Sequence, residues 1–312
     1  MLTFAERERN CEREFANAGP FWHLYTNGKR TDNIFCNNED FKIAMVALAV
    51  VAVLFKKVGI ITFELMSNHI HLILNGDEDA CLEFFEQFKR RLRRTLRSNG
   101  RFVDWERFQA EILKIDNLAA LRNEIIYTNR NAFVANPDYT PFSYPWGGGC
   151  AYFSPIFNSF PTKSLSELGF NRGRELTHFR DIRLLGELKF VDDVVHIPSF
   201  CRIDIGERMF RDARSYFNSL TRNAEAFSEI ASRLKDSVFL TDDEIYAVAA
   251  KYAESSFGNR QLGLLSPEQK IQLSKELHFK YNASNQQIRR ILKLNLEILD
   301  ELFPPQSIPS VK

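Results

Sequence analysis

The chain has 312 residues, of which 45% are hydrophobic and 26% are charged, a composition typical of a globular protein with room for two domains. Its 41 Lys and Arg residues balance 40 Asp and Glu residues, so the net charge gives no argument for a polyanionic partner. The five cysteines follow no metal-clip or redox spacing, which favours a reducing, cytoplasmic location.

The chain carries no pattern typical of export or of a membrane span. Its opening residues alternate in charge and lack the apolar segment of a secretory signal. The longest apolar run, Ile43–Phe55, is shorter than the roughly 20 residues that cross a bilayer. We therefore expect no membrane partner, and we predict that this run forms a helix buried in the core.

The first half of the sequence predicts alternating strands and helices. Strands are indicated by β-rich runs closed by Asn-Gly turns, and helices by apolar residues spaced three and four apart. This order predicts an α+β sandwich with helices over an antiparallel sheet. The expected elements are a strand at residues 20–28, a helix opened by residues 37–40, two strands within 59–76, a helix at 78–98, a strand around 108–115 and a helix at 117–131.

The second half changes in composition and then becomes mostly helical. Residues 137–174 are rich in Pro, Gly, Ser and aromatic residues, which indicates a linker or an extension along the surface. Capping boxes begin at Thr241, Ser266 and Ser284, and each leads into an apolar periodic segment. We expect a first domain at 1–149, a linker or extension at 150–175 and a helical accessory region at 176–312.

The end of the helical region suggests a helix-turn-helix at residues 266–303. Arg289 and Arg290 would be exposed there and would contact DNA. The turn lacks a glycine, and the third helix carries acidic residues where a groove-reading helix needs cations. A structural helical bundle therefore stays open as the alternative.

Two histidines two residues apart are the first candidate site. His69 and His71 lie in a β-type run, so both imidazoles project from the same face of the strand and can reach one metal ion. Glu64, on the preceding run, is a further possible ligand. Its orientation depends on how the chain bends at Ser67-Asn68, so it stays outside the predicted set.

A tyrosine and an asparagine four residues apart are the second candidate site. Tyr127 and Asn131 share one face of the predicted helix in LRNEIIYTNRN. Tyr139 and Tyr144 lie nearby and are rival nucleophiles, but they stand in a proline-broken loop and are expected to pack there. The other histidines, at 23, 178, 196 and 278, have no partner at a recognisable spacing and are expected at the surface or in the core.

The string FELMSNHIHLIL resembles the signature strand of HUH endonucleases, specifically of the single-tyrosine transposases that include the REP-associated branch. Their hallmark is Leu-Met-x-Asn-His-x-His followed by a hydrophobic residue. The resemblance extends over residues 21–146, about 40% of the chain, through WHLYTNG and through YTNRNAFVANPDYTPFSYPWG. Replication initiators and relaxases share such a strand, but histidines followed by a single tyrosine on a later helix favour the transposase branch.

The resemblance implies a ferredoxin-like antiparallel sheet, a divalent cation and single-stranded or hairpin DNA as the substrate. It implies that Tyr127 is the nucleophile and that Asn131 completes a metal shell with His69 and His71. Mg²⁺ or Mn²⁺ would activate the phosphate, and cleavage would pass through a 5′-phosphotyrosine. An inactive, domesticated DNA-binding regulator with the same fold is the alternative, and a monomer and a homodimer both stay open.

A run of cations on one helix and its exit is the candidate DNA-backbone surface. No acidic residue interrupts the run, although the chain as a whole is neutral. A solvated helix face is the alternative reading. The predicted contacts are Lys89, Arg90, Arg91, Arg93, Arg94, Arg97 and Arg101.

Overall fold

The structure is a computed structural model in which the chain forms two compact units, Met1–Thr221 and Arg222–Lys312. The first unit contains the sheet and the predicted catalytic residues, and the second is helical. The structure describes residues 3–28, 31, 33–135, 140, 142–222, 230, 233–234, 240 and 242–304.

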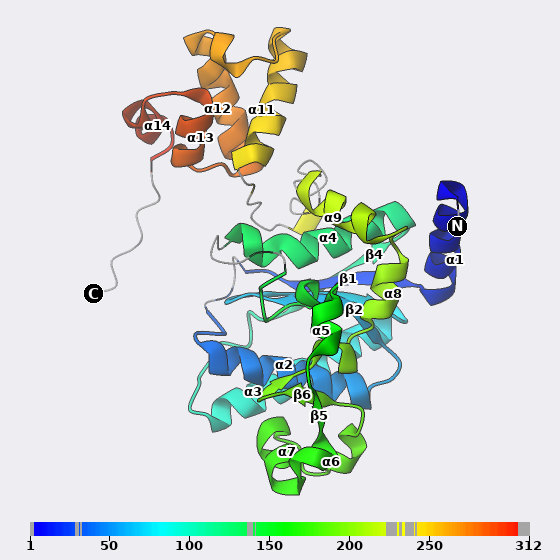
Figure 1. Ribbon diagram of the computed structural model, residues 1–312. Helices are drawn as coiled ribbons and strands as arrows, with labels where there is room; N and C mark the ends of the chain where they lie inside the picture. The colour runs from blue at the N-terminus through cyan, green and yellow to red at the C-terminus, as the bar shows by residue number, and fades with distance from the viewer. Residues whose placement is uncertain are drawn as a thin grey trace. The chain divides into compact units, whose positions relative to one another are not determined.

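The first unit is built on a four-stranded antiparallel sheet with helices on both faces (Figure 1). The strands lie in the order β2-β3-β1-β4, so the first strand of the chain is central. This arrangement confirms the α+β class. The strands are β1 (Phe21–Thr26), β2 (Gly59–Leu65), β3 (Ile70–Asn75) and β4 (Ala110–Ile115).

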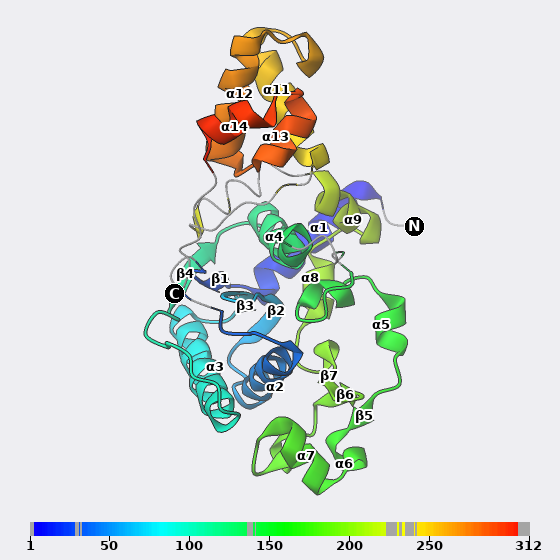
Figure 2. The same cartoon turned by 90° about the vertical axis from the view of Figure 1, so that its left-hand side faces the viewer.

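Helices α2 (Asn38–Leu54) and α3 (Glu78–Ser98) pack on one face of the sheet, as both views show (Figure 2). Helix α2 begins after Asn37, whose side chain accepts a hydrogen bond from the Asp40 amide at 2.9 Å. Its apolar run is buried nearly all round, which confirms the predicted core helix. No described helix combines the length and the apolar character needed to cross a bilayer.

Helix α4 (Leu118–Ala135) covers the opposite face of the sheet (Figures 1 and 2). It starts where the sequence predicts, because the Asn117 side chain accepts a hydrogen bond from the Ala120 amide at 2.8 Å. The strands are therefore covered on both sides, and every residue of β1 is buried. Polar side chains that point toward α4 need partners inside the protein.

Residues 148–221 pack against the first unit, so this unit continues past the boundary expected at residue 149. Tyr152 is fully buried, and its hydroxyl donates to the Ile61 carbonyl at 2.9 Å. Of the aromatic residues that suggested a linker, Phe142, Phe160 and Phe170 are exposed, whereas Tyr144, Trp146 and Tyr152 are buried in this contact layer. Its elements are η1 (Gly148–Ala151), α5 (Pro155–Ser159), β5 (Lys163–Ser164), α6 (Leu165–Leu168), α7 (Phe170–Thr177), η2 (Ile182–Leu185), β6 (Lys189–Val191), β7 (Val194–Val195), η3 (Ile197–Ser199), α8 (Ile203–Arg208) and α9 (Ala213–Arg222).

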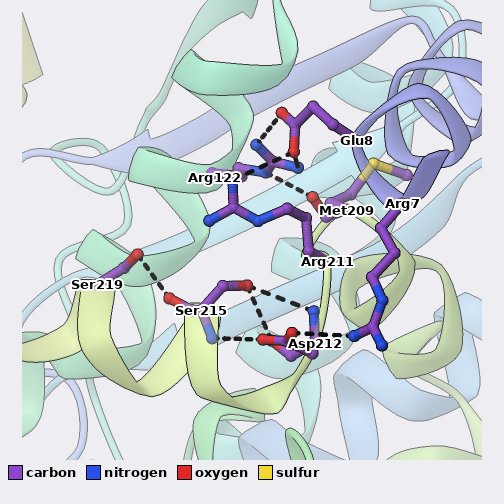
Figure 3. Close-up of polar contacts among 8 residues, drawn as sticks. All are labelled: Arg7, Glu8, Arg122, Met209, Arg211, Asp212, Ser215 and Ser219. Carbon is purple, nitrogen blue, oxygen red and sulfur yellow. Dashed lines mark hydrogen bonds and ion pairs between the residues drawn. The ribbon is translucent and has the colours of Figure 1, made fainter. Parts of the chain in front are cut away.

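A cluster of ion pairs joins helix α4 to the N-terminal helix α1 (Phe4–Ala18) and to the segment between α8 and α9 (Figure 3). The Arg122 guanidinium binds both Glu8 carboxylate oxygens, at 2.7 and 3.2 Å, and its Nε donates to the Met209 carbonyl at 2.5 Å. Hydrogen bonding to Arg122 also lowers the pKa of Glu8. The cluster ties α4 to segments that lie outside the four-stranded sheet.

We expect Arg122→Met to lower the free energy of unfolding of the first unit by about 2 kcal/mol, because it leaves Glu8 and the Met209 carbonyl without this donor. Because the folded-state pKa of Glu8 is lowered, this stabilisation is present above the ordinary carboxyl range and is lost as the pH falls through the lowered value. Urea denaturation at neutral and at acidic pH measures the difference. Arg107→Ala, which removes an exposed pair with Asp104, is the control.

The second unit contains the helices predicted near the end of the chain. The capping boxes at Ser266 and Ser284 are confirmed, since each side chain accepts from an amide three residues on. Thr241 lies outside the described residues. The elements of the second unit are α11 (Asp242–Phe257), η4 (Leu262–Leu264), α12 (Pro267–Tyr281), α13 (Asn285–Leu292) and α14 (Leu296–Leu302).

Candidate functional site

A polar row crosses the sheet on the face that α4 covers. The strand register places Glu64 of β2 opposite His71 of β3, His71 opposite Tyr25 of β1, and Tyr25 opposite Glu111 of β4. The Tyr25 hydroxyl donates to the Glu111 carboxylate at 2.9 Å. Glu64 thus lies on the same face as His71, which answers the question that its position in the sequence leaves open.

The two predicted metal-binding histidines lie side by side in the structure. The ring centroids of His69 and His71 are 5.1 Å apart, as expected for neighbours on one face of an extended chain. His71 is 1% exposed, whereas His69 is half-buried near the start of β3. The His-x-His pair therefore extends from the buried middle of the sheet to the start of the central strand β3.

Helix α4 places three polar side chains along one stripe above the histidines. Glu124, Tyr127 and Asn131 are spaced three and four residues apart, so they share one helix face. The Tyr127 ring contacts the His71 ring edge to face, with centroids 5.6 Å apart. The Asn131 carboxamide Nδ2 lies 3.2 Å from His71 Nε2. All four predicted catalytic and metal-binding residues are thus brought together within one chain.

His23 joins the same cluster as a buried core histidine, which is one of the two positions expected from the sequence, and its polar partners are ones that no sequence spacing indicates. Its Nδ1 lies 2.8 Å from a Glu124 carboxylate oxygen, and its Nε2 lies 3.0 Å from His71 Nδ1. His23 and Glu124 are 0% and 1% exposed. The only sequence signal for this contact was that His23 and Tyr25 are two residues apart in a strand and therefore lie on the same face. The pairing itself depends on strand register and on how α4 docks.

His69, at the start of β3, is held by a separate set of contacts. His69 Nδ1 lies 2.7 Å from the Asn68 carboxamide oxygen, and Asn68 Nδ2 donates to the Gly28 carbonyl at 2.9 Å. A Cβ atom at residue 28 would stand 2.8 Å from His69 Nδ1. Glycine in the Asn27-Gly28 turn therefore lets the backbone approach the imidazole closely.

A second polar contact line ties α4 to β2 and α9. The Thr62 hydroxyl donates to the Asn129 carboxamide oxygen at 2.5 Å, and Asn129 Nδ2 donates to the Tyr216 hydroxyl at 2.9 Å. All three side chains are buried, and burial raises the pKa of Tyr216. These bonds fix the rotation of α4 about its own axis, and with it the stripe that faces His71.

The rival tyrosines do not share this environment. The Tyr144 hydroxyl donates to the Leu65 carbonyl at 2.5 Å, so this side chain packs as the sequence suggests. Tyr139 lies outside the described residues. Among the described tyrosines near the site, Tyr127 combines a helix position with contacts to His71.

The donor set fits a hard divalent cation that keeps some of its water. His69, His71 and Asn131 offer two imidazoles and one carboxamide, which leaves positions for phosphate oxygens and water. The Asn131 atom that lies 3.2 Å from His71 Nε2 is the amide nitrogen, so the carboxamide would have to turn to present its oxygen to an ion. Among the described residues, no group of three or more His, Cys, Asp and Glu side chains is arranged to hold an ion.

The predicted DNA-binding cations differ in how they are held. Arg91 is buried, donates to the Thr177 carbonyl and packs over the Phe179 ring; burial lowers its pKa to about 10. Arg101 pairs with Asp40 at 3.1 Å. Lys89 is half-buried, whereas the exposed members of the run on α3 are Arg90, Arg93, Arg94 and Arg97.

The cations predicted on the second unit also differ. Arg290 forms two contacts with the Asp242 carboxylate, at 2.6 and 2.9 Å, which raise the pKa of Arg290. Arg289 is exposed. The structure thus uses one arginine of the predicted pair to join α13 to α11.

Comparison with family models, with curated proteins and with solved structures finds no match to this chain. The likeness of its β3 strand to the HUH signature therefore remains a likeness of motif. The functional conclusion depends on the geometry of the site.

Proposed function

We propose that this chain is a single-tyrosine DNA strand transferase of the HUH kind, with Tyr127 as the nucleophile and a Mg²⁺ or Mn²⁺ ion held by His69, His71 and Asn131. One observation carries the proposal. A tyrosine and a carboxamide on α4 meet the His-x-His strand of the same chain, although about 60 residues separate Asn131 from His71. A structural helix face needs no such set of residues.

The order of elements supports a ferredoxin-like catalytic domain. From Phe21 to Ile115 the elements follow the order β1, α2, β2, β3, α3, β4, which is the β-α-β-β-α-β order of a ferredoxin-like domain. In the sheet, β1 and β3 are the central strands, and β2 and β4 are the edge strands. Helices α2 and α3 leave one sheet face to α4. In this proposal the domain comprises the residues expected at 1–149, and the segment at 150–221 supports α4 from outside.

The reaction needs a phenol brought to a phosphate. A phenol with a pKa of about 10 is a weak nucleophile at neutral pH, so the site must favour loss of its proton. The bound ion supplies charge stabilisation at a nonbridging phosphate oxygen. The Tyr127 hydroxyl gives up its proton as its oxygen forms a bond to phosphorus, the bond from phosphorus to the 3′ oxygen breaks, and the 3′ oxygen takes up one proton, so that there is no net change in protons. The phosphotyrosine conserves the energy needed to rejoin a strand.

The site is complete within one chain, which supports attack by Tyr127 in cis. The segment that would have to move for a tyrosine exchange between two subunits is α4. Its described side chains Arg122, Asn129 and Asn131 are bonded to other elements of the same unit. We therefore infer that a monomer can cleave. A cytoplasmic location belongs to the same proposal.

We infer that DNA beyond the cleaved bond contacts the exposed arginines of α3. Helix α3 lies across the sheet from the site, so these contacts position flanking DNA (Figure 2). Arg94 shares a hollow of about 670 Å³ with Arg174 and Arg180. No described carboxylate lies within ion-pair distance of these three guanidinium groups. Phosphate groups would neutralise them.

Charge reversal in this hollow tests the contact. Arg94→Glu combined with Arg180→Glu should weaken binding of single-stranded and hairpin DNA, and each lost phosphate contact should reduce the slope of log Kd against log salt by about 1. Fluorescence anisotropy over a salt series measures both quantities. Arg183→Glu, which removes an exposed arginine already paired with Asp181 at 2.8 Å, should change neither. An unchanged slope in the double variant rules out this surface.

Arg289 is the DNA contact we propose on the second unit, because Arg290 is engaged with Asp242. Helices α12, α13 and α14 follow one another as a helix-turn-helix would require, and this succession is the only support for that prediction. A helical bundle without DNA contact remains the alternative for this unit. Arg289→Glu distinguishes the two, since only a DNA-binding unit would lose affinity.

One observation favours the alternative of a non-catalytic DNA-binding regulator. Tyr127 is 4% exposed and His71 is 1% exposed, so DNA reaches the phenol only if covering segments move. The deciding experiment incubates the full chain with labelled single-stranded hairpin DNA and Mn²⁺ and analyses it under denaturing conditions. A covalent adduct that depends on Tyr127 supports the transferase, and tight binding without an adduct supports the regulator.

A further inference from the structure

We propose that Glu124 and His23 are positioning residues that fix the His71 imidazole in the tautomer with hydrogen on Nδ1, so that the Nε2 lone pair points toward Asn131. The inference rests on the proposed function only where the ion is concerned. The tautomer is a property of the chain by itself. Metal ligation by histidine requires a lone pair at the ligating nitrogen, so the tautomer decides whether His71 can bind.

The series of hydrogen bonds begins at the buried Glu124 carboxylate. An ionised carboxylate only accepts hydrogen bonds, so at 2.8 Å the hydrogen between Glu124 and His23 belongs to His23 Nδ1. Both groups are almost fully buried, and the bond is therefore shielded from competing water. In a neutral His23 ring, Nε2 then carries the lone pair.

The next contact transmits this choice to His71. His23 Nε2 lies 3.0 Å from His71 Nδ1, and an acceptor at the first atom requires a donor at the second. His71 Nδ1 therefore carries the hydrogen. His71 Nε2 keeps its lone pair, and it accepts a hydrogen bond from the Asn131 Nδ2–H at 3.2 Å.

The contacts at His69 lead independently to the same tautomer. The Gly28 carbonyl can only accept, so the Asn68 amide group must face it, and the Asn68 oxygen must face His69 Nδ1. His69 Nδ1 therefore donates, and the lone pair of His69 is on Nε2. Two separate series of hydrogen bonds thus leave the lone pair on Nε2 in both histidines. One series ends at the Glu124 carboxylate, and the other ends at the Gly28 carbonyl.

Asn131 also has a defined part in this arrangement. With no ion bound, its amide group satisfies the lone pair of His71. A half-turn of the carboxamide about its last side-chain torsion would present the oxygen in place of the nitrogen. The same side chain can therefore stabilise the site without metal and contribute a ligand when metal is present.

The first test needs no variant. The full chain is labelled with ¹⁵N-histidine, and long-range proton–nitrogen correlation spectra are recorded at neutral pH without metal. Both His69 and His71 should show the tautomer with hydrogen on Nδ1. Hydrogen on His71 Nε2 would mean that His23 donates to His71, and the proposal would then be wrong.

The second test compares buried histidines. His23→Leu removes the acceptor at His71 Nδ1 and should weaken Mn²⁺ binding, measured by calorimetry, by about 10- to 100-fold. It should also release His71 from the tautomer with hydrogen on Nδ1, so that the form with hydrogen on Nε2 gains population. His196→Leu is the control, because His196 is buried in the same unit and contacts the Phe157 carbonyl away from the site. Equal Mn²⁺ affinity in the two variants would overturn the proposal.

The two proposals fail in different ways. If His71 has hydrogen on Nδ1 and Mn²⁺ binding depends on His23, the positioning role stands even when no DNA adduct forms. If an adduct forms at Tyr127 but His71 shows the other tautomer, the transferase stands and the positioning role does not.

Discussion

Tyr127→Phe is expected to reduce the yield of covalent protein–DNA adduct by on the order of 10³-fold or more, because it removes the attacking oxygen, and the hydroxyl of Tyr25, the other phenol beside His71, is hydrogen-bonded to Glu111. Binding of the same hairpin DNA should stay within about twofold, since the ring and its edge-to-face contact with His71 are kept. The adduct is measured on denaturing gels with labelled DNA and Mn²⁺, and affinity is measured by anisotropy.

Tyr144→Phe is the matched control for this experiment. Tyr144 is also buried, and its hydroxyl is bonded to the Leu65 carbonyl away from the histidines. This variant should keep the adduct and lose only a modest amount of stability. An adduct that persists in Tyr127→Phe, or one that disappears in Tyr144→Phe alone, would contradict the assignment of the nucleophile.

Gly206→Ala should lower the free energy of unfolding of the first unit by about 3 kcal/mol or more. A Cβ atom at residue 206 would stand 1.9 Å from the Tyr152 hydroxyl oxygen. Tyr152 cannot move aside easily, because it is fully buried, stacks on Tyr216 at 5.3 Å and donates to the Ile61 carbonyl. The substitution therefore disturbs the layer that holds α4 through Tyr216 and Asn129.

Thermal unfolding of the first unit should show the effect as a fall in Tm of roughly 6–12 °C, from about 2–4 °C for each kcal/mol in a unit of this size. Gly186→Ala is the control within the same unit. Its backbone is in the helical region, and its added Cβ would meet the Arg183 carbonyl at an ordinary 3.7 Å. That change should leave Tm equal or slightly higher. Equal Tm values for the two variants would show that residues 150–221 are not integral to the unit.

The arginine run shows where pattern and packing diverge. The spacing of apolar residues predicted helix α3 with its correct ends, because one buried face is a local property of the sequence. From the sequence we predicted that every cation of this run contacts DNA. The structure buries Arg91 against Thr177 and pairs Arg101 with Asp40, because segments distant in sequence supply those partners. The segment expected to be a linker differs for the same reason, since Tyr152 finds a buried partner in Ile61 of β2.

The sequence by itself determined the four strands of the main sheet, the helices α2, α3 and α4 that cover it, and the local geometry of the two pairs, whereas helix α1 and the short strands β5, β6 and β7 were not predicted. His69 and His71 share a face because side chains alternate along a strand, and Tyr127 and Asn131 share a face because a helix repeats every 3.6 residues. The tertiary structure decided that these faces meet, that His23 and Glu124 complete the cluster, and that Glu64 faces the same way as His71. Those facts depend on strand register and helix docking, which arise from packing between residues far apart in the chain and leave no periodic signal in the sequence.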